Sequence, residues 1–328
     1  MPSNAAVKEL WTVFAAVLPV FGLMLAGFVL RRIKWLTADA DESLLRICVN
    51  VLLPCLIFES VLGNAALQRK ENLFWPPLIA VFTILLGIGV GWIAAKCIGL
   101  REPVERRTFA LTAGLQNYGY IPLPLCILLF DPGTVGVLLV HNVGVEVVLW
   151  TVGMAVLSGR GFQGGWRKII NAPLVALVFA LALNAFGSGV LNPQIIHVGS
   201  IAMTAVHWLG QCAIPLALLL IGAIIADHLP EIHGGQSVRI VSAGIVVRLI
   251  ILPPIFFLLA RWLPVSIEMK RVIVVQGAMS SAVLPVALAK HFGGDPRTAL
   301  QVVLATSLVG LVAIPIWIQV GGRICALW

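Results

Sequence analysis

Two proline-containing segments, residues 115–124 and 278–285, carry the polar residues with the clearest chemical potential. Pro122 and Pro285 lack an N–H group and clash with the carbonyl four residues earlier, so we expect a helix to break before each. A broken helix offers free N–H groups and a partial positive charge, which suit a carboxylate. The candidate ligand-binding residues here are Asn117, Tyr118, Gly119, Tyr120, Pro122, Ser280, Ser281 and Pro285.

A purely structural explanation of these segments is also available. Proline and glycine could kink two helices while the nearby polar side chains replace the lost backbone hydrogen bonds. For one isolated kink this explanation is the better one. Two breaks at matching positions favour a binding site, because paired broken helices are typical of transporters.

A second pair of polar residues lies in similar surroundings. Asn50 is four residues before Pro54, and Gln211 is four residues before Pro215. Each could bind a ligand, or could satisfy the carbonyl that the proline leaves without its usual donor. The sequence favours neither alternative.

Two ionisable residues, Glu146 and Arg248, lie near the centres of apolar stretches. A charge in hydrocarbon costs at least ~2.5 kcal/mol, so each should have a partner and a task. They could form a structural ion pair with each other. Alternatively, Arg248 is the counter-charge of an anion and Glu146 binds a coupling proton. His141, Asn142 and His207 are weaker candidates.

Composition and motifs exclude most other kinds of site. The sequence has no HExxH, GxSxG or Walker motif, so we predict no catalytic residues, no cofactor and no metal site. Its six cysteines include no CxxC pair. The net charge of +8 comes from basic residues scattered at the ends of apolar stretches, which argues against nucleic-acid binding.

The elements that must position these residues are membrane helices. Of the 328 residues, 60% are hydrophobic and 11% are charged, with a mean hydropathy of +1.02, which no ordinary soluble domain shows. We therefore predict an all-α polytopic membrane protein. The first apolar stretch is long for a signal peptide and has no cleavage pattern, so we interpret it as a retained span. The ten predicted spans are 11–30, 43–63, 73–99, 105–130, 134–158, 168–189, 197–226, 237–262, 268–290 and 298–320.

The second half of the chain repeats marks of the first. Gly114 and Pro122 are matched by Gly277 and Pro285, 163 residues later. An Asp-Pro pair follows each break, at 131–132 and 295–296, and Asn50 matches Gln211 at an offset of 161. We predict two five-span repeats, 1–158 and 168–328. Because five is odd, the second repeat should be inverted in the membrane.

The basic residues predict the orientation. Alternate loops carry seven Lys and Arg residues on one side of the membrane and thirteen on the other. The positive-inside rule then places the loops 30–43, 96–107, 159–168, 227–239 and 290–298 in the cytoplasm. Both termini should lie outside the cell membrane.

The sequence resembles the auxin efflux carrier family of permeases, within the larger group that includes the bile acid sodium symporters. The resemblance rests on residues 117–124, on 282–286 with 292–296, and on 50–54, and it extends over essentially the whole chain. It implies a scaffold of spans 1, 2, 6 and 7, a transport domain of spans 3–5 and 8–10, broken helices that cross at the binding site, and a homodimer. Without a long hydrophilic insert between its halves, the chain is similar to compact bacterial members, which implies the bacterial inner membrane.

These observations together predict a secondary active transporter of small organic anions. Family members are associated with auxin, malate or malonate, and the resemblance implies an elevator mechanism. Proton coupling at Glu146 or uniport is favoured, because no carboxylate lies at either break to bind Na⁺. The alternatives are a sodium-coupled symporter of the bile-acid type and a membrane receptor that binds the same anion without moving it.

Overall fold

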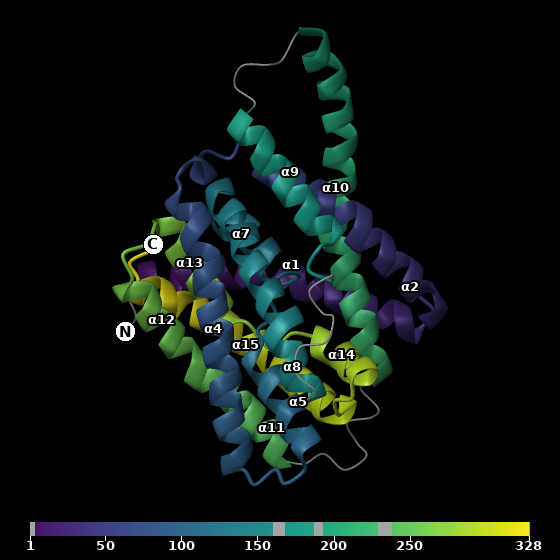
Figure 1. Cartoon of the computed structure of the whole chain (residues 1–328), viewed down its shortest axis with the longest axis vertical. Coiled ribbons are helices and arrows are strands. Elements are labelled where there is room, and N and C mark those ends of the chain that lie inside the picture. The colour runs from purple at the N-terminus through teal and green to yellow at the C-terminus, as the bar shows by residue number, and fades with distance from the viewer. Residues whose placement is uncertain (1–3, 160–167, 187–192, 229–237, 328) are drawn as a thin grey trace.

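The computed structural model describes residues 4–159, 168–186, 193–228 and 238–327, and in these ranges the regular elements are all helices (Figure 1). The first half contains α1 (Asn4–Arg32), α2 (Ala38–Ile47), η1 (Cys48–Leu52), α3 (Leu53–Val61), η2 (Ala65–Gln68), α4 (Glu71–Cys97), α5 (Pro103–Gly114), α6 (Pro122–Leu129), α7 (Pro132–Val148), η3 (Leu149–Gly153) and α8 (Met154–Ser158). The second half contains α9 (Ala172–Phe186), α10 (Pro193–His228), α11 (Val238–Ile245), η6 (Val246–Ile251), α12 (Leu252–Trp262), α13 (Ile267–Ala278), α14 (Leu284–Phe292) and α15 (Pro296–Ile324).

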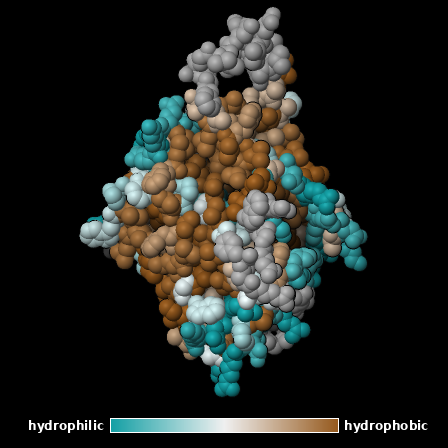
Figure 2. Space-filling view, viewed as in Figure 1, coloured by the Kyte–Doolittle hydropathy of each residue, from teal (hydrophilic) through white to brown (hydrophobic). Residues whose placement is uncertain are grey.

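Seven of the described helices are long and apolar enough to cross a membrane. They are Trp11–Arg32, Ala38–Val61, Glu71–Cys97, Pro132–Ser158, Ile201–Asp227, Val238–Trp262 and Pro296–Ile324. Large apolar side chains such as Trp11 and Ile93 are more than half exposed on the outside of the bundle. Figure 2 shows apolar surface across the middle of one face, with hydrophilic residues toward its margins. The protein is therefore a multi-pass membrane protein.

Three predicted spans are not among the seven. The apolar helix Ala172–Ala185 has only 14 residues in the described part of the chain. The predicted spans 105–130 and 268–290 are interrupted, as expected from their prolines. The first divides into α5 and α6, and the second into α13 and α14. The count of ten spans stays a prediction.

Glycines at the two breaks are required by close packing. A side chain on Gly114 would lie 2.4 Å from the backbone of Gly87 in α4, and one on Gly277 would lie 2.8 Å from the Cβ atom of Phe256 in α12. Neither glycine has a positive φ angle. The glycine that precedes each break therefore lets the end of the half-helix approach its neighbour.

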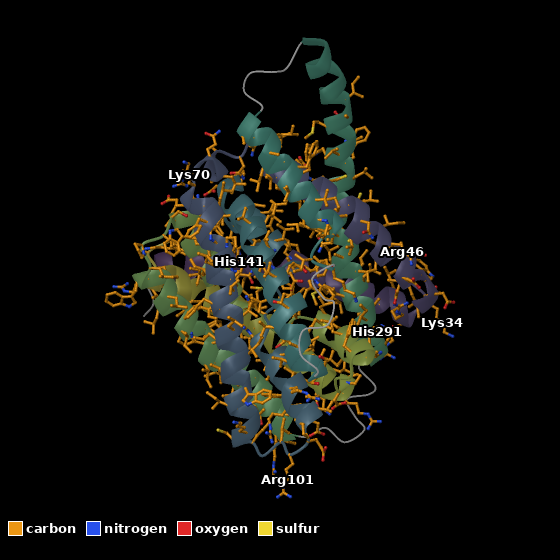
Figure 3. The ribbon with its side chains drawn as sticks, in the orientation of Figure 1. Lys34, Arg46, Lys70, Arg101, His141 and His291 are labelled. Atoms are coloured by element: carbon orange, nitrogen blue, oxygen red, sulfur yellow. The ribbon has the colours of Figure 1, made fainter. Side chains whose placement is uncertain are left out.

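The described helices form two sets of close contacts, which α1 joins through α6 and α15 and α3 joins through α7. In the first, α1 packs along α10, and α3 packs against α9 and α10. In the second, α4 packs against α5 and α7, while α13 packs against α12, α15 and α7. Both sets combine elements from the two halves of the chain, and the two interrupted helices belong to the second set. Figure 3 labels His141 of α7 inside the bundle, and this side chain is 1% exposed.

The Asp-Pro pairs that follow the breaks have the same local structure. Asp131 caps α7 by accepting the N–H of Thr134, and Asp295 caps α15 by accepting the N–H groups of Arg297 and Thr298. The repeated Asp-Pro marks thus correspond to the same local capping structure. The inverted orientation of the two repeats, and the repeat bounds 1–158 and 168–328, stay predictions. The predicted loops 159–168 and 227–239 lie mostly outside the described residues.

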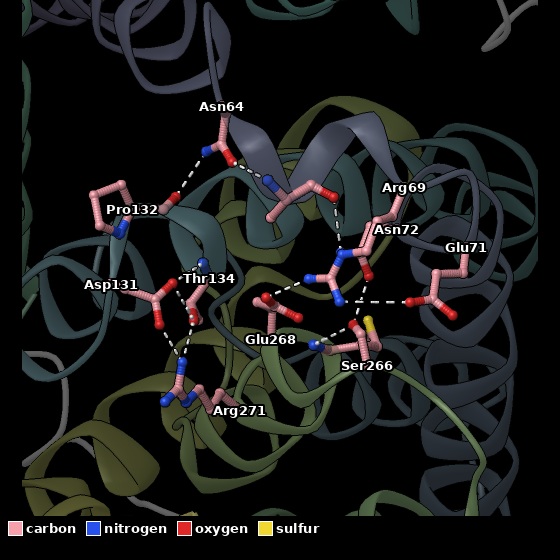
Figure 4. A network of polar contacts seen from close by, with 12 residues as sticks. Asn64, Arg69, Glu71, Asn72, Asp131, Pro132, Thr134, Ser266, Glu268 and Arg271 are labelled. Carbon is pink, nitrogen blue, oxygen red and sulfur yellow. Dashed lines mark hydrogen bonds and ion pairs between the residues drawn. The ribbon is translucent and has the colours of Figure 1, made fainter.

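A polar network joins the two halves at one end of the bundle (Figure 4). Arg271 of α13 forms an ion pair with Asp131 at the start of α7, and Arg69 forms one with Glu268. The hydroxyl of Ser266 donates to the side chain of Asn72 at 2.5 Å. These contacts tie the loops before α4, α7 and α13 together.

The neighbours of Asp131 in this network affect the ionisation of its carboxyl group. Partial burial raises the pKa of Asp131, but the N–H group of Thr134 and the guanidinium of Arg271 outweigh burial together, and the pKa lies below its ordinary value. The carboxylate is therefore charged at neutral pH, as the ion pair requires.

Candidate functional site

A cavity of about 490 Å³ lies at the crossing of the two interrupted helices. One part of its wall is formed by α2, η1, α3, α9 and α10. The other part is formed by the two breaks together with α7, η3 and α14. The volume is in the ordinary range for a small-molecule site. Most of the lining is apolar. The polar side chains that reach it are Asn117, Tyr118, Tyr120, Asn142, Glu146, Trp150, Lys168 and Asn171.

The two breaks are paired with each other through their backbones. The N–H of Asn117 donates to the carbonyl of Ser280 at 2.8 Å, and the N–H of Ala282 donates to the carbonyl of Leu115 at 2.9 Å. These bonds form an isolated antiparallel bridge between Gln116 and Ser281. The broken segments therefore cross in direct contact.

The first break borders the cavity. Residues Asn117, Tyr118, Gly119 and Tyr120 all line it. The carbonyl of Tyr118 accepts the side-chain amide of Gln276 at 3.1 Å. Within the described part of the chain, the N–H groups of Tyr118, Gly119 and Tyr120 have no acceptor. Three backbone donors are thus available beside the cavity.

These free donors lie in the extended segment and not in the first turn of α6. Pro122 begins α6, is buried and does not line the cavity. The N–H of Leu123 already donates to the carbonyl of Gly119, and Pro124 has no N–H. The sequence predicted free donors at the start of the half-helix. In the structure they lie in the residues just before α6.

Glu146 is the carboxylate of the cavity wall. It accepts the hydroxyl of Tyr118 and the indole N–H of Trp150, each at 2.7 Å. It forms no ion pair with Arg248, so the pairing considered from the sequence is not present. Glu146 instead connects α7 to the first break through Tyr118.

The second break has most of its groups covered by protein. Ala282, Val283 and Leu284 line the cavity, but Ser280, Ser281 and Pro285 do not. The N–H of Ser281 donates to the hydroxyl of Thr306 at 3.2 Å. The hydroxyls of Ser280 and Ser281 are buried and have no partner in the part of the chain that the structure describes.

Arg248 covers the end of the half-helix α13. Its side chain is 0% exposed and is not part of the cavity wall. Its Nε atom donates to the carbonyl of Met279 at 2.8 Å, and its Nη2 atom donates to the carbonyls of Gln276 and Gly277 at 3.2 Å. The last carbonyls of a helix lack intrahelical partners and carry partial negative charge. Arg248 thus satisfies the carbonyls that the break exposes.

Asn50 and Gln211 lie outside the cavity. Both are exposed, and the side chain of Asn50 donates to the carbonyl of Arg46 at 2.9 Å. Asn50 therefore stabilises its own helix, although at a carbonyl other than the one that Pro54 leaves free. Gln211 lies on α10, four residues before Pro215.

Sequence reasoning missed three polar residues of the cavity wall, namely Trp150, Lys168 and Asn171. Trp150 lies in a largely apolar stretch, and Lys168 and Asn171 resemble ordinary residues at the end of a span. The sequence shows how many residues separate these side chains from an expected break. That separation does not indicate whether they lie near the break in the folded protein. Asn142, a weaker sequence candidate, does line the cavity.

Comparison with known proteins decides the family. The sequence profile of the family described as membrane transport protein matches residues 12–164 and 161–318. The chain belongs to this family of auxin efflux carrier-like transporters. The family assignment agrees with the resemblance found at the breaks.

Relatives of this transporter are found in archaea and bacteria. It is 26% identical to an uncharacterized transporter of Methanothermobacter thermautotrophicus over 311 residues, which covers 92% of this chain and 96% of the relative. It is 21% identical to the uncharacterized transporter MJ1031 of Methanocaldococcus jannaschii and to the uncharacterized transporter YfdV of Escherichia coli O157:H7, with the same coverage. The similarity therefore extends over nearly the full length of each protein.

Proposed function

We propose that this family member is a secondary active transporter of small organic anions that binds its substrate in the cavity at the first break. The proposal rests mainly on one observation. Three free backbone N–H donors, at Tyr118, Gly119 and Tyr120, lie beside the side-chain amide of Asn117 at the cavity. Backbone donors in a low-dielectric site favour an acceptor with negative charge. A carboxylate satisfies them, and the apolar remainder of the wall accommodates the body of the acid.

The position of the cavity supports alternating access. It lies between a scaffold group (α1, α3, α9 and α10) and a transport group (α4, α5, α7 and α13 to α15), so sliding one group past the other would expose the ligand to either side. This division agrees with the proposed scaffold of spans 1, 2, 6 and 7 and transport domain of spans 3–5 and 8–10. The scaffold pair α1 and α10 packs closely, since a side chain on Gly222 would lie 1.8 Å from the carbonyl of Met24. Such packing keeps the scaffold rigid during an elevator movement.

Liposome uptake tests the proposal. Purified protein should accumulate at least one acid of a panel of malonate, malate, phenylacetate and indole-3-acetate, in a saturable manner and without nucleotide. Saturable binding of an acid without flux would favour a receptor. Failure to bind or move any of the four acids would contradict the proposal.

We propose a proton, bound at Glu146, as the coupling ion if transport is coupled. The carboxylate lies in the cavity wall, and its bond to Tyr118 connects it to the proposed anion site. Protonation removes a negative charge next to the incoming anion, so binding of the two is mutually favourable. The described residues contain no cluster of three or more His, Cys, Asp or Glu side chains around a common point.

Separate pH and Na⁺ gradients test this coupling. A pH gradient should stimulate uptake by the unchanged protein, and Glu146→Gln should abolish that stimulation while leaving passive exchange measurable. Stimulation by Na⁺ alone would favour the sodium-coupled symporter of the bile-acid type. Uptake that is indifferent to both gradients would indicate a uniporter.

We propose ten spans in two inverted repeats, with both termini outside a bacterial inner membrane. Cysteine labelling in a background without the six native cysteines tests it. A cysteine at Gln163, which lies outside the described residues, should react only from the cytoplasm. Reaction only from outside would reverse the assignment.

We also propose that two copies associate through the scaffold. The Nδ1 atom of His207 in α10 lies 2.6 Å from the Oε1 atom of Glu59 in α3, and both side chains are partly exposed. The next residue, Trp208, is 69% exposed. Such polar groups are costly against lipid, and a second copy would cover them. Light scattering in detergent should show a dimer, and Trp208→Glu should reduce it to a monomer. A monomeric unchanged protein would contradict this assembly.

A further inference from the structure

Lys168 is a cation in the cavity wall that the proposed function does not yet use. It is the first described residue before α9, and its side chain is exposed while lining the cavity. Among the described residues that line the cavity it is the one with a basic side chain. It is thus placed where it can affect which ligands enter.

Aromatic rings hold the ammonium group of Lys168. Its Nζ atom lies 4.5 Å from the ring centroid of Phe292 in α14 and 5.2 Å from that of Trp150 in η3. A cation over an aromatic face at an exposed site is held only weakly. An entering anion can therefore compete for this ammonium group.

Trp150 separates the two opposite charges of the cavity. Its indole N–H donates to Glu146, and its ring lies under Lys168. Lys168 and Glu146 both line the cavity, yet they form no ion pair with each other. The positive charge of Lys168 is consequently not neutralised by the carboxylate of the same wall.

We infer that Lys168 is the counter-charge that makes the cavity selective for organic anions over neutral molecules of the same shape. The inference rests on the proposed function, because it concerns the ligand of the same cavity. Lys168 attracts the anion and lowers its free energy in the cavity, whereas the first break supplies directional hydrogen bonds. Lys168 therefore discriminates between ligands by their charge and not by their shape.

Matched ligands and variants test this role. The ligands are phenylacetate with phenylacetamide, and malonate with malonamide, which differ in charge but little in size. The variants are Lys168→Gln, Lys168→Arg and the control Lys290→Gln, which removes a lysine charge from the exposed surface of α14, outside the cavity wall. Binding is measured by thermal stabilisation in detergent, and uptake in liposomes.

We expect Lys168→Gln to weaken binding and uptake of the bound acid by about tenfold or more, which is the usual effect of losing one interaction with a charged group. Lys168→Arg should restore most of the affinity, and Lys290→Gln should leave it unchanged. Any affinity for the neutral amides should be the same in all variants. An effect through folding alone would weaken amides and acids together and would overturn the inference.

The remaining outcomes separate this inference from the proposed function. Equal acid affinity in Lys168→Gln and the unchanged protein would overturn the role of Lys168 and leave anion transport standing. Lys168-dependent binding without uptake would support the counter-charge and overturn transport. Absence of both binding and uptake for both acids in the unchanged protein would overturn both.

Discussion

The two helix breaks are paired through their backbones but differ in what surrounds them. At the first break, the N–H groups of Tyr118 to Tyr120 border the cavity. At the second, Arg248 covers the carbonyls of α13, and Thr306 accepts the N–H of Ser281. Proline interrupts both helices in the same way, whereas the neighbouring spans decide whether the freed groups meet a cavity or protein. Repeated sequence marks therefore give repeated backbone structure without repeated chemistry.

The largest expected effect is at Arg248. Arg248→Met removes the donors of three buried carbonyls, and the unsatisfied groups should lower the free energy of unfolding by roughly 3 kcal/mol or more. Thermal unfolding in detergent measures this loss. Arg239→Met, which removes an exposed arginine from the same span, is the control and should change little.

Anion binding by the Arg248 variant decides between the two breaks. The folded fraction should bind the acid as the unchanged protein does. A different result would reverse the roles of the two breaks. If Arg248→Met folds normally but no longer binds the anion, while variants at the first break bind it normally, the substrate is held at the second break.

A smaller effect separates Asn117 from Ser280. Asn117→Ala should weaken anion binding by roughly ten- to a hundredfold, since one hydrogen bond to a charged group contributes ~1.5–3 kcal/mol. The sequence alone made Ser280 a candidate ligand-binding residue as well. Because Ser280 is buried away from the cavity, we now expect less than about a twofold change. Titration of both variants with the transported acid measures the difference, and equal losses would show that both breaks contact the ligand.

The smallest effects concern the caps that follow the breaks. Asp131→Ala and Asp295→Ala should each cost about 1 kcal/mol of stability, the usual value of a helix N-cap. Asp131 also pairs with Arg271, so its loss should additionally make unfolding less sensitive to salt. Thermal unfolding at two ionic strengths measures both effects. Identical salt dependence of the two variants would contradict the added role of Asp131.

Acid should remove part of the Asp131 contribution. Its folded pKa lies below the ordinary value, so this contribution is present above about pH 4 and is lost as the pH falls through the folded pKa. Unfolding of Asp131→Ala should therefore be less sensitive to acid in this range than unfolding of the unchanged protein. Equal sensitivity would show that the cap and ion pair are not coupled to folding.

The sequence predicted the parts of the structure that depend on local chemistry. Pro122 and Pro285 interrupt their helices because a proline lacks a donor wherever it lies, and the structure confirms both interruptions. The Asp-Pro pairs were noted in the sequence only as repeated marks, and the structure shows that Asp131 and Asp295 each accept backbone N–H groups two or three residues further on.

The sequence could not predict contacts between distant residues. That Arg248 contacts the carbonyls of residues about 30 positions away depends on where the fold places η6 relative to the end of α13. Lys168 reaches the cavity because α9 lies beside α3. Ser280 and Asn117 have similar surroundings in the sequence, yet only Asn117 lines the cavity. Polar residues at a break are therefore candidates whose role depends on tertiary packing.

Because of the backbone bridge between the breaks, neither half of the chain can fold completely without the other. The first half supplies the N–H of Asn117 and the carbonyl of Leu115, and the second supplies the carbonyl of Ser280 and the N–H of Ala282. In a bilayer an amide group without a partner is too costly to leave exposed. A polypeptide that stopped after Gly159 would carry these groups into the membrane unmatched and become a target for proteolysis. Two fragments made in the same cell should instead rescue each other, each acting as the folding template of its counterpart.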